Sequence, residues 1–343
     1  MKKKGIYVVG ALLLIGLFAP LFQKSTAPGF YLEVLLGGLM AGVLYSLVAL
    51  GFVLIFKASG VFNFAQGAMV LFAALAMARL AEWLPKWIGI PAGWPATTLA
   101  FILATGIMIL LAMVIERIVL RPLVNQEGVA LLMATLGVTY FLDGFGQTIW
   151  GSDIYKIDLG ISKDPLMAFE GVFQGGILLN REDILAAVIA TALVAGLAVF
   201  FQKTATGRAL RAVADDHQAA QSIGIPLNKI WVIVWAVAGF VALVAGMVWG
   251  AKLGVQFSLS QLALKALPVV ILGGFTSIPG AIIGGLIIGV GEKMAEVFLG
   301  PVLIKAFDLA GGGIENWFAY MLALLFLMVR PEGLFGEKHI DRV

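Results

Sequence analysis

Long apolar stretches recur along almost the whole chain, and this pattern limits the possible folds more than any other feature. A helix needs about 17 to 25 mostly apolar residues to cross roughly 30 Å of hydrocarbon, and the shorter alternating strands of a membrane barrel are absent from the pattern. The candidate stretches are residues 5–22, 31–56, 61–80, 97–119, 129–150, 184–201, 230–250, 265–275, 279–298 and 317–329. The sequence therefore predicts an all-α polytopic transmembrane bundle of about 8 to 10 membrane segments, some of them interrupted.

Composition narrows the class further. Of the 343 residues, 61% are hydrophobic and 13% are charged, which leaves too few polar side chains to cover a water-soluble surface. There is no cysteine, and the two histidines, His217 and His339, cannot form a conventional zinc site by themselves. We therefore expect an integral membrane protein with membrane lipid around it, no metal site and no cofactor. The net charge of +3 does not indicate a nucleic-acid partner.

The first apolar stretch, residues 5–22, allows two interpretations. A signal peptide would be cleaved near residues 25–27, but Pro28 would directly follow the cut. The stretch is also longer than the usual apolar core of about 7 to 15 residues. We favour an uncleaved first helix.

The placement of basic residues predicts how the chain crosses the membrane, since Lys and Arg near the ends of spans favour the inside. With the amino terminus inside, the inside loops contain Lys57, Arg117, Arg121, Lys203, Arg208, Arg211 and Lys229. Residues 151–183 then form an outside loop with an acidic excess, and both termini lie in the cytoplasm. This topology requires residues 265–298 to cross as a broken pair, which we favour, or to enter as a re-entrant hairpin before a full span.

Another outside loop is predicted around the tryptophans Trp83, Trp87 and Trp94. Tryptophan rings favour the headgroup level of a membrane. Pro85, Pro91 and Pro95 lie in the same loop and should prevent helix continuation. We therefore expect the preceding helix to end near residue 80.

Two clusters of glycine and polar residues interrupt the apolar stretches near opposite ends of the chain. They are GFVLIFKASGVFNFAQG (residues 51–67) and GGFTSIPGAIIGG (residues 273–285). Non-helical backbone at membrane depth persists only where protein or water satisfies it, so interrupted spans in the two halves of a transporter indicate its pathway. The resulting pathway candidates are Asn63, Gln66, Gly67, Gly273, Gly274, Thr276 and Ser277.

Polar residues on the 129–150 stretch are further candidates. Thr135, Thr139, Asp143 and Gln147 follow an i, i+4 spacing that aligns them on one face of a helix. Such a stripe suits either a pathway lining or a hydrogen-bonded helix contact. We include Thr139 and Asp143 as pathway candidates because a carboxylate inside a span is costly and usually faces a cavity or a counter-charge.

Other charged residues are predicted near the membrane interfaces. Glu33, Lys265, Glu292 and Glu296 lie towards the ends of apolar stretches. We expect these side chains to be solvated or to extend towards the headgroups.

No motif predicts an enzyme. A Walker A sequence reads GxxxxGK followed by Ser or Thr, and the nearest segment here, GVGEK at residues 289–293, lacks both the spacing and the hydroxyl. Neither a GxSxG nor an HExxH segment is present. We therefore predict no catalytic residue, and any energy for transport must come from a separate partner.

A polar segment, TGRALRAVADDHQAAQSIGIPLNK (residues 206–229), separates two long apolar stretches. Thr206 can cap a helix beginning near Gly207, and Gly224 with Pro226 forms a helix stop. The segment is either a solvated inside loop or a short helix that docks in a groove on another protein. Its apolar residues are too few to span a bilayer but sufficient for such docking: Leu210, Val213, Ala219, Ala220 and Ile223.

Four segments together resemble a known family. They are GVLYSLVALGFVLIFKASGVFNFAQGAMV (residues 42–70), GRALRAVADDHQAAQSIGIPLNKIWVIVWAVAGFVALVAG (207–246), LKALPVVILGGFTSIPGAIIGGLIIGVGEK (264–293) and RPEGLFGEK (330–338). In order and over nearly the whole chain, they are similar to LivH-type permease subunits of bacterial ABC importers for branched-chain amino acids. The 151–183 loop is the least typical part.

The resemblance implies a single permease domain, residues 1–343, in the bacterial inner membrane. Residues 203–229 would be the cytoplasmic loop that couples to the ATPase. The implied partners are a second permease subunit, two cytoplasmic ATP-binding subunits and a periplasmic substrate-binding protein. The coupling residues carried over from the resemblance are Gly207, Arg208, Leu210, Arg211, Ala212, Asp215, Asp216, Ala219, Ala220, Gly224 and Ile225.

The implied function is transport of branched-chain or related amino acids, with ATP hydrolysis by a separate subunit. Related permeases serve urea, short amides or other amino acids, so these substrates stay open. A secondary transporter coupled to an ion is the rival class, and Asp143 is the deeply placed carboxylate available for it.

Overall fold

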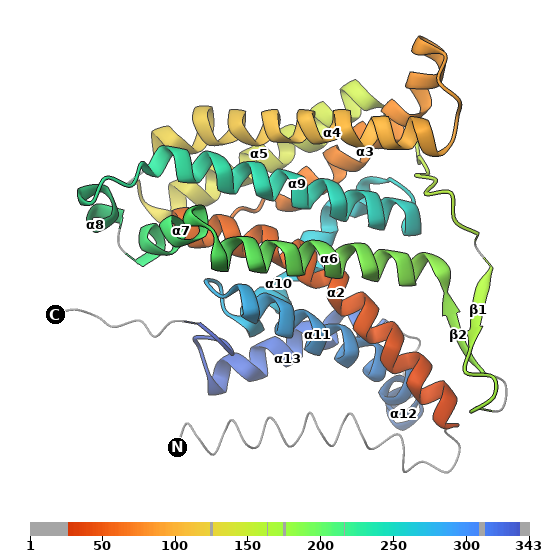
Figure 1. The fold of residues 1–343 in the computed structure, drawn as a ribbon. Helices are drawn as coiled ribbons and strands as arrows, with labels where there is room; N and C mark the ends of the chain where they lie inside the picture. The colour runs from red at the N-terminus through yellow and green to blue at the C-terminus, as the bar shows by residue number, and fades with distance from the viewer. Residues whose placement is uncertain are drawn as a thin grey trace. The chain divides into compact units, whose positions relative to one another are not determined.

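The computed structural model describes residues 27–123, 126–162, 164–173, 176–215, 217–308 and 313–336 (Figure 1). The predicted helix at residues 5–22 and the coupling candidate Asp216 lie outside this described part. For residues 215–218, including Asp215, the side chains also lie outside it.

Six helices of the described part are long and apolar enough to cross a membrane. They are α2 (Pro28–Ser59), α3 (Gln66–Ile88), α4 (Trp94–Val114) with its continuation through η2 (Ile115–Leu120) and η3 (Arg121–Leu123), α5 (Gly128–Trp150), α6 (Arg181–Lys203) and α9 (Leu227–Leu253). This confirms a polytopic helical protein. The predicted total of 8 to 10 segments is not confirmed, because these helices number six, or up to seven with a bent pair.

The bent pair occupies the predicted broken region. Its first limb contains η4 (Phe257–Gln261) and α10 (Leu262–Gly273), and its second contains α11 (Ile278–Met294), η5 (Ala295–Leu299) and α12 (Gly300–Phe307). The limbs are bent by 115°. A shorter apolar helix, α13 (Ile314–Val329, 16 residues), follows.

Three further elements lie in the loops between these helices. The predicted outside loop contains a two-stranded antiparallel sheet, β1 (Pro165–Ala168) and β2 (Ile177–Asn180). The backbone N–H of Leu178 donates to Glu33 Oε2 at 3.1 Å, which attaches the sheet to α2. The polar segment forms two short helices, α7 (Ala205–Asp215) and α8 (His217–Ser222).

The expectation that Pro85 prevents helix continuation is wrong. Pro85 lies inside α3, which ends at Ile88, and Gly89 terminates the helix in a left-handed conformation (φ 69°). Proline removes one helical hydrogen bond, but the side chains of neighbouring residues in the same helix contact one another. The Trp83 and Trp87 rings lie 5.2 Å apart, and the Arg79 guanidinium lies 4.7 Å from the Trp83 ring.

The chain divides into two compact units. The first unit contains Met1–Ser46, Ser162–Thr191 and Lys265–Val343, and the second contains Leu47–Ile161 and Ala192–Leu264. Each unit is therefore assembled from segments far apart in the sequence.

The core of the second unit is built around α3, which contacts α4, α5, α9 and η4. The buried face of α4 carries small side chains at every fourth position, which places them on one side of the helix. They are Ala96, Ala100, Ala104 and Ala112, with Met108 between them. Small residues let helix backbones approach closely. A Cβ at Gly246 of α9, for example, would lie 2.6 Å from the Val70 carbonyl oxygen in α3.

The first unit contains an equally close helix contact, between α2 and α11. A Cβ at Gly38 would lie 2.8 Å from Val290 Cα, and one at Gly42 would lie 2.6 Å from the Gly285 carbonyl oxygen. The Ser46 hydroxyl bonds to the Ile282 carbonyl oxygen at 3.1 Å. Glycine is therefore needed because the two backbones touch.

Gly37 and Gly38 provide a matched test of this contact. Both lie in α2, but a Cβ at Gly37 meets nothing within 4 Å. We expect Gly38→Val to destabilise the protein by about 1–3 kcal/mol relative to Gly37→Val, since only the first forces backbones apart. Thermal unfolding of both variants in the same detergent measures the difference. Equal midpoints would contradict the proposed contact.

Candidate functional site

The first predicted break lies between α2 and α3, and buried polar side chains stabilise it. Asn63 and Gln66 are fully buried. Asn63 Oδ1 accepts the Ala65 N–H at 3.1 Å, and its Nδ2 lies 3.5 Å from Gln66 Oε1. Two carbonyls beside the break also have side-chain donors: Trp231 Nε1 donates to Ala58 at 2.9 Å, and the Thr135 hydroxyl bonds to Phe62 at 3.3 Å.

Two features of this break are an unpaired polar atom and a close backbone contact. Gln66 Nε2 is buried and has no hydrogen-bond partner among the described residues. At Gly67, an added Cβ would collide with the Ser260 carbonyl oxygen of η4. The break is therefore packed tightly against η4 of the second unit, and the Gln66 Nε2 donor has no hydrogen-bond partner among the described residues.

The polar stripe on α5 lies on the more buried side of that helix. Thr135 and Asp143 are buried, whereas Thr139 and Gln147 are half-buried. Thr139 donates to the Thr135 carbonyl at 2.9 Å. Asp143 Oδ1 is buried without a hydrogen-bond partner in the part of the chain that the structure describes. An unpaired carboxylate oxygen in such a place is costly, so the stripe stays a candidate for function.

The second predicted break lies between α10 and α11. Gly274 has a φ of +103°, a conformation that favours glycine, and Ser277 caps α11 by accepting the Gly280 N–H at 3.0 Å. Thr276 is half-buried beside them. A Cβ at Gly273 would collide with the Gly280 carbonyl, so the two limbs touch at the bend.

The end of the described chain covers this second break. The backbone N–H of Leu334 donates to the Leu272 carbonyl at 2.8 Å, and that of Phe335 donates to the Gly273 carbonyl at 3.1 Å. The last carbonyls of a helix lack partners within the helix. The RPEGLFG segment thus supplies the donors that the end of α10 needs.

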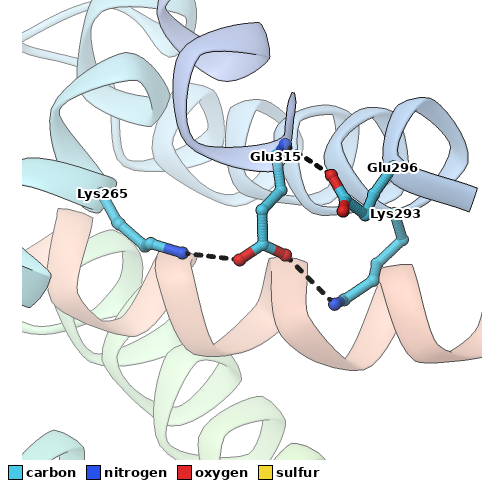
Figure 2. A network of polar contacts seen from close by, with 4 residues as sticks. All are labelled: Lys265, Lys293, Glu296 and Glu315. Atoms are coloured by element: carbon cyan, nitrogen blue, oxygen red, sulfur yellow. Dashed lines mark hydrogen bonds and ion pairs between the residues drawn. The ribbon is translucent and has the colours of Figure 1, made fainter. Parts of the chain in front are cut away.

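Glu315, in the first turn of α13, lies between two lysines of the bent pair (Figure 2). Its Oε1 is 3.4 Å from Lys265 Nζ in α10, and its Oε2 is 3.4 Å from Lys293 Nζ in α11. Its backbone N–H donates to Glu296 Oε2 in η5 at 3.0 Å. This set of four residues, the Glu315 network, connects α13 to both limbs of the bent pair.

The expectation that Glu292 is solvated near an interface is wrong. Its side chain is only 2% exposed, and the Tyr45 hydroxyl of α2 hydrogen-bonds to it. The close glycine contact between α2 and α11 brings Glu292 against α2, away from solvent. Among the described residues, no group of three or more His, Cys, Asp or Glu side chains could hold a metal ion.

The predicted coupling segment differs in detail from the sequence prediction. Helix α7 begins at Ala205, two residues early, because Thr204 rather than Thr206 caps it; Thr204 Oγ1 accepts the Gly207 N–H at 3.1 Å. Gly224, with a φ of +86°, ends the short helices as expected. Ala212 and Ile225 are half-buried.

The apolar face of this segment is used within the second unit. Leu210, Val213 and Ala220 are buried, and both α7 and α8 contact α9. Ala219 and Ile223 stay exposed, the latter by 75% of its surface. The predicted groove contact can therefore involve only this exposed part of the apolar set.

Comparison with known proteins identifies the family. The sequence model described as branched-chain amino acid transport system, permease component, matches residues 34–329. The chain belongs to this family. The resemblance to LivH-type permeases is thereby confirmed, and so is the prediction of a transport component rather than an enzyme.

Individual relatives of the permease agree in length. It is 26% identical to the high-affinity branched-chain amino acid transport system permease protein LivH of Escherichia coli K12, covering 92% of this chain and 98% of LivH. It is 27% identical to the high-affinity branched-chain amino acid transport system permease protein BraD of Pseudomonas aeruginosa, and the match covers 91% of this chain and 98% of BraD. It is also 25% identical to the fructose import permease protein FruF of Bifidobacterium longum, and this match covers 81% of this chain and 77% of FruF.

Sequence reasoning missed several residues that organise the permease. Glu315 and Thr204 were not singled out, and Glu116 of η2 was not either. Glu116 is fully buried and bonds through both carboxylate oxygens to Arg121, at 2.8 to 3.1 Å. A Glu–Arg pair five residues apart is not a usual helical spacing; the π-helical turn between them brings the two side chains together.

Neutralising Glu315 tests the network in the permease. We expect Glu315→Gln to lower the free energy of unfolding by about 1 kcal/mol, because Lys265 and Lys293 lose their shared carboxylate. The loss should shrink at 1 M salt, where charges are screened beyond roughly 3 Å. Thermal unfolding at low and high salt measures it, with the exposed Glu170→Gln as control. A loss independent of salt would contradict an electrostatic role.

Proposed function

We propose that this chain is the membrane-spanning permease subunit of an ABC importer and forms, with a second permease, a translocation pathway for branched-chain amino acids. The observation that carries the proposal is the match to LivH and BraD over more than nine-tenths of both chains. ATP hydrolysis belongs to separate subunits, and a substrate-binding protein delivers the solute. The chain lies in the inner membrane with both termini in the cytoplasm.

The pathway is proposed to involve the two breaks and the α5 stripe. Each unit contains one break, and each break frees backbone groups that a continuous helix would pair internally. The residues proposed for it are Asn63, Gln66, Gly67, Thr139, Asp143, Gly273, Gly274, Thr276 and Ser277. Gln66 Nε2 and Asp143 Oδ1 are buried and have no hydrogen-bond partner within the described ranges, which supports the choice, because unpaired polar atoms at depth are costly and suit transient contacts.

Residues 203–229 are proposed as the coupling loop to the ATPase. Within it, the exposed side of α8 and the turn after it form the contact, with Ile223 as the apolar anchor. A large aliphatic side chain exposed beside Ala219 and Gly224 suits a hydrophobic pocket on a partner. The basic residues of this loop support a cytoplasmic location.

The ATPase contact is tested by capture of the partner. We expect the tagged permease to co-purify with its ATP-binding subunits, and Ile223→Glu to reduce the captured amount at least about tenfold, because burying an unpaired charge is costly. Ile154→Glu is the matched control: Ile154 is 67% exposed but lies in the proposed outside loop. Undiminished capture by Ile223→Glu would reject this contact, and no capture by the parent chain would reject the importer.

Substrate and energy source are tested by uptake. We expect vesicles with the assembled importer and its binding protein to accumulate leucine, isoleucine and valine when ATP is inside, and to lose uptake without ATP. Fructose, urea and short amides serve as competitors, since FruF imports a sugar by name. Preferred uptake of a competitor would change the substrate assignment. Uptake that persists without ATP but stops with a proton uncoupler would favour the ion-coupled transporter.

A further inference from the structure

The turn between α6 and α7 is held by side chains of α7 that reach back to the end of α6. Arg211 Nη1 donates to the Phe201 carbonyl at 2.6 Å, and its Nη2 donates to the Gln202 carbonyl at 3.3 Å. Arg208 Nη1 donates to the Lys203 carbonyl at 3.2 Å. The last carbonyls of a helix lack partners within it, and the helix dipole favours a cation there. The two arginines meet both needs.

Thr204 and Gly207 close the same turn from within. The Thr204 hydroxyl donates to the Phe200 carbonyl at 2.7 Å and accepts the Gly207 N–H, so one side chain ends α6 and begins α7. An added Cβ at Gly207 would collide with the Phe201 carbonyl oxygen. The angle between α6 and α7 is therefore set by hydrogen bonds and by backbone contact, not by a free linker.

Arg211 is thus engaged within its own chain. Both of its terminal nitrogens bond to carbonyls of α6, whereas the apolar side of α7, including Leu210 and Val213, is buried in the second unit. Arg211 is exposed, but both terminal nitrogens of its guanidinium already donate within the chain, although the resemblance puts it in the coupling loop. Its charge stabilises the joint between a span and the loop.

We propose, as an inference that rests on the proposed function, that Arg211, Thr204 and Gly207 form an elbow that makes α6 and α7 move as one body. Arg211 acts there as a positioning residue and does not contact the ATPase. Movement imposed on the loop by the ATPase is then transmitted to α6. Without the elbow, movement of the loop is passed to α6 less directly, because only the main-chain turn then joins α7 to the end of α6, while α7 keeps its contacts with α9.

The stiffness of the elbow can be measured directly, since the chain contains no cysteine. Spin labels on Ala195→Cys in α6 and Ala212→Cys in α7 report the distance between the two helices in the full-length permease. We expect one narrow distance distribution in the parent chain and in Arg117→Ala, an exposed arginine outside the elbow. Arg211→Ala should broaden the distribution, and Arg211→Lys should restore part of it by bonding one carbonyl.

The assembled importer then tests the consequence for transport. We expect Arg211→Ala to capture the ATP-binding subunits as well as the parent chain does. Solute transported per ATP hydrolysed should fall at least about tenfold, the factor that corresponds to losing even one of the two charge-assisted hydrogen bonds of Arg211. Gly207→Ala should have the same effect through the Phe201 carbonyl, whereas Gly196→Ala, which meets nothing within 4 Å, should not.

The outcomes separate the elbow from the proposed function. If the parent chain captures no ATP-binding subunit, the importer itself is rejected. If the parent captures it but Arg211→Ala loses capture while Arg117→Ala keeps it, Arg211 is a direct contact and the elbow is overturned. The elbow is also overturned if Arg211→Ala has the same distance distribution as the parent chain. It is overturned as well if the distribution broadens but the solute transported per ATP hydrolysed does not change. Should Arg211→Ala fail to fold, Arg211→Lys and Gly207→Ala carry the same comparison.

Discussion

Every interrupted span of this permease depends on one constraint: backbone groups freed by a break inside hydrocarbon must find partners within the protein. At the first break, indole and hydroxyl donors from α9 and α5 reach the Ala58 and Phe62 carbonyls. At the second break, backbone N–H groups of residues 334 and 335 reach the end of α10. Both solutions use segments distant in sequence, so each break is stable only in the folded unit.

Glycine allows close backbone contact both between helices and at the breaks. Along α2 and α11 it removes side chains where two backbones meet, and a hydroxyl at Ser46 adds an interhelical hydrogen bond. This contact carries Glu292 into a buried position beside Tyr45. Tight packing therefore determines where a charged residue can lie, and the Glu315 network pairs Lys265 and Lys293 of the bent pair with one carboxylate.

Much of the fold could be predicted from apolar periodicity and from the two glycine-rich interruptions. The helices α5, α6 and α9 begin and end within a few residues of the predicted stretches, and the bent pair lies where a broken span was expected. Predictions from the neighbouring sequence alone failed at Pro85 and Glu292. Pro85 lies inside α3, which continues to Ile88, and Glu292 is buried because α2 approaches α11.

The candidate site was less predictable than the fold. The resemblance located the coupling loop, but sequence alone could not show that Arg211 faces α6 or that Leu210 and Val213 are buried in their own unit. Such choices depend on the direction of a side chain after a turn, which spacing does not determine. Pairs brought together by unusual turns, such as Glu116 and Arg121 across a π-helical segment, are hidden for the same reason.

The dependence of α10 on residues 334 and 335 has a consequence for biosynthesis. The first unit consists of three separate segments of the chain, and the last to be synthesised begins at Lys265. Until residues 334 and 335 have been synthesised, the Leu272 and Gly273 carbonyls cannot form the hydrogen bonds that these residues donate. The contacts at the end of α10 therefore form only after residue 335 has been made, whereas all segments of the second unit have been made by Leu264.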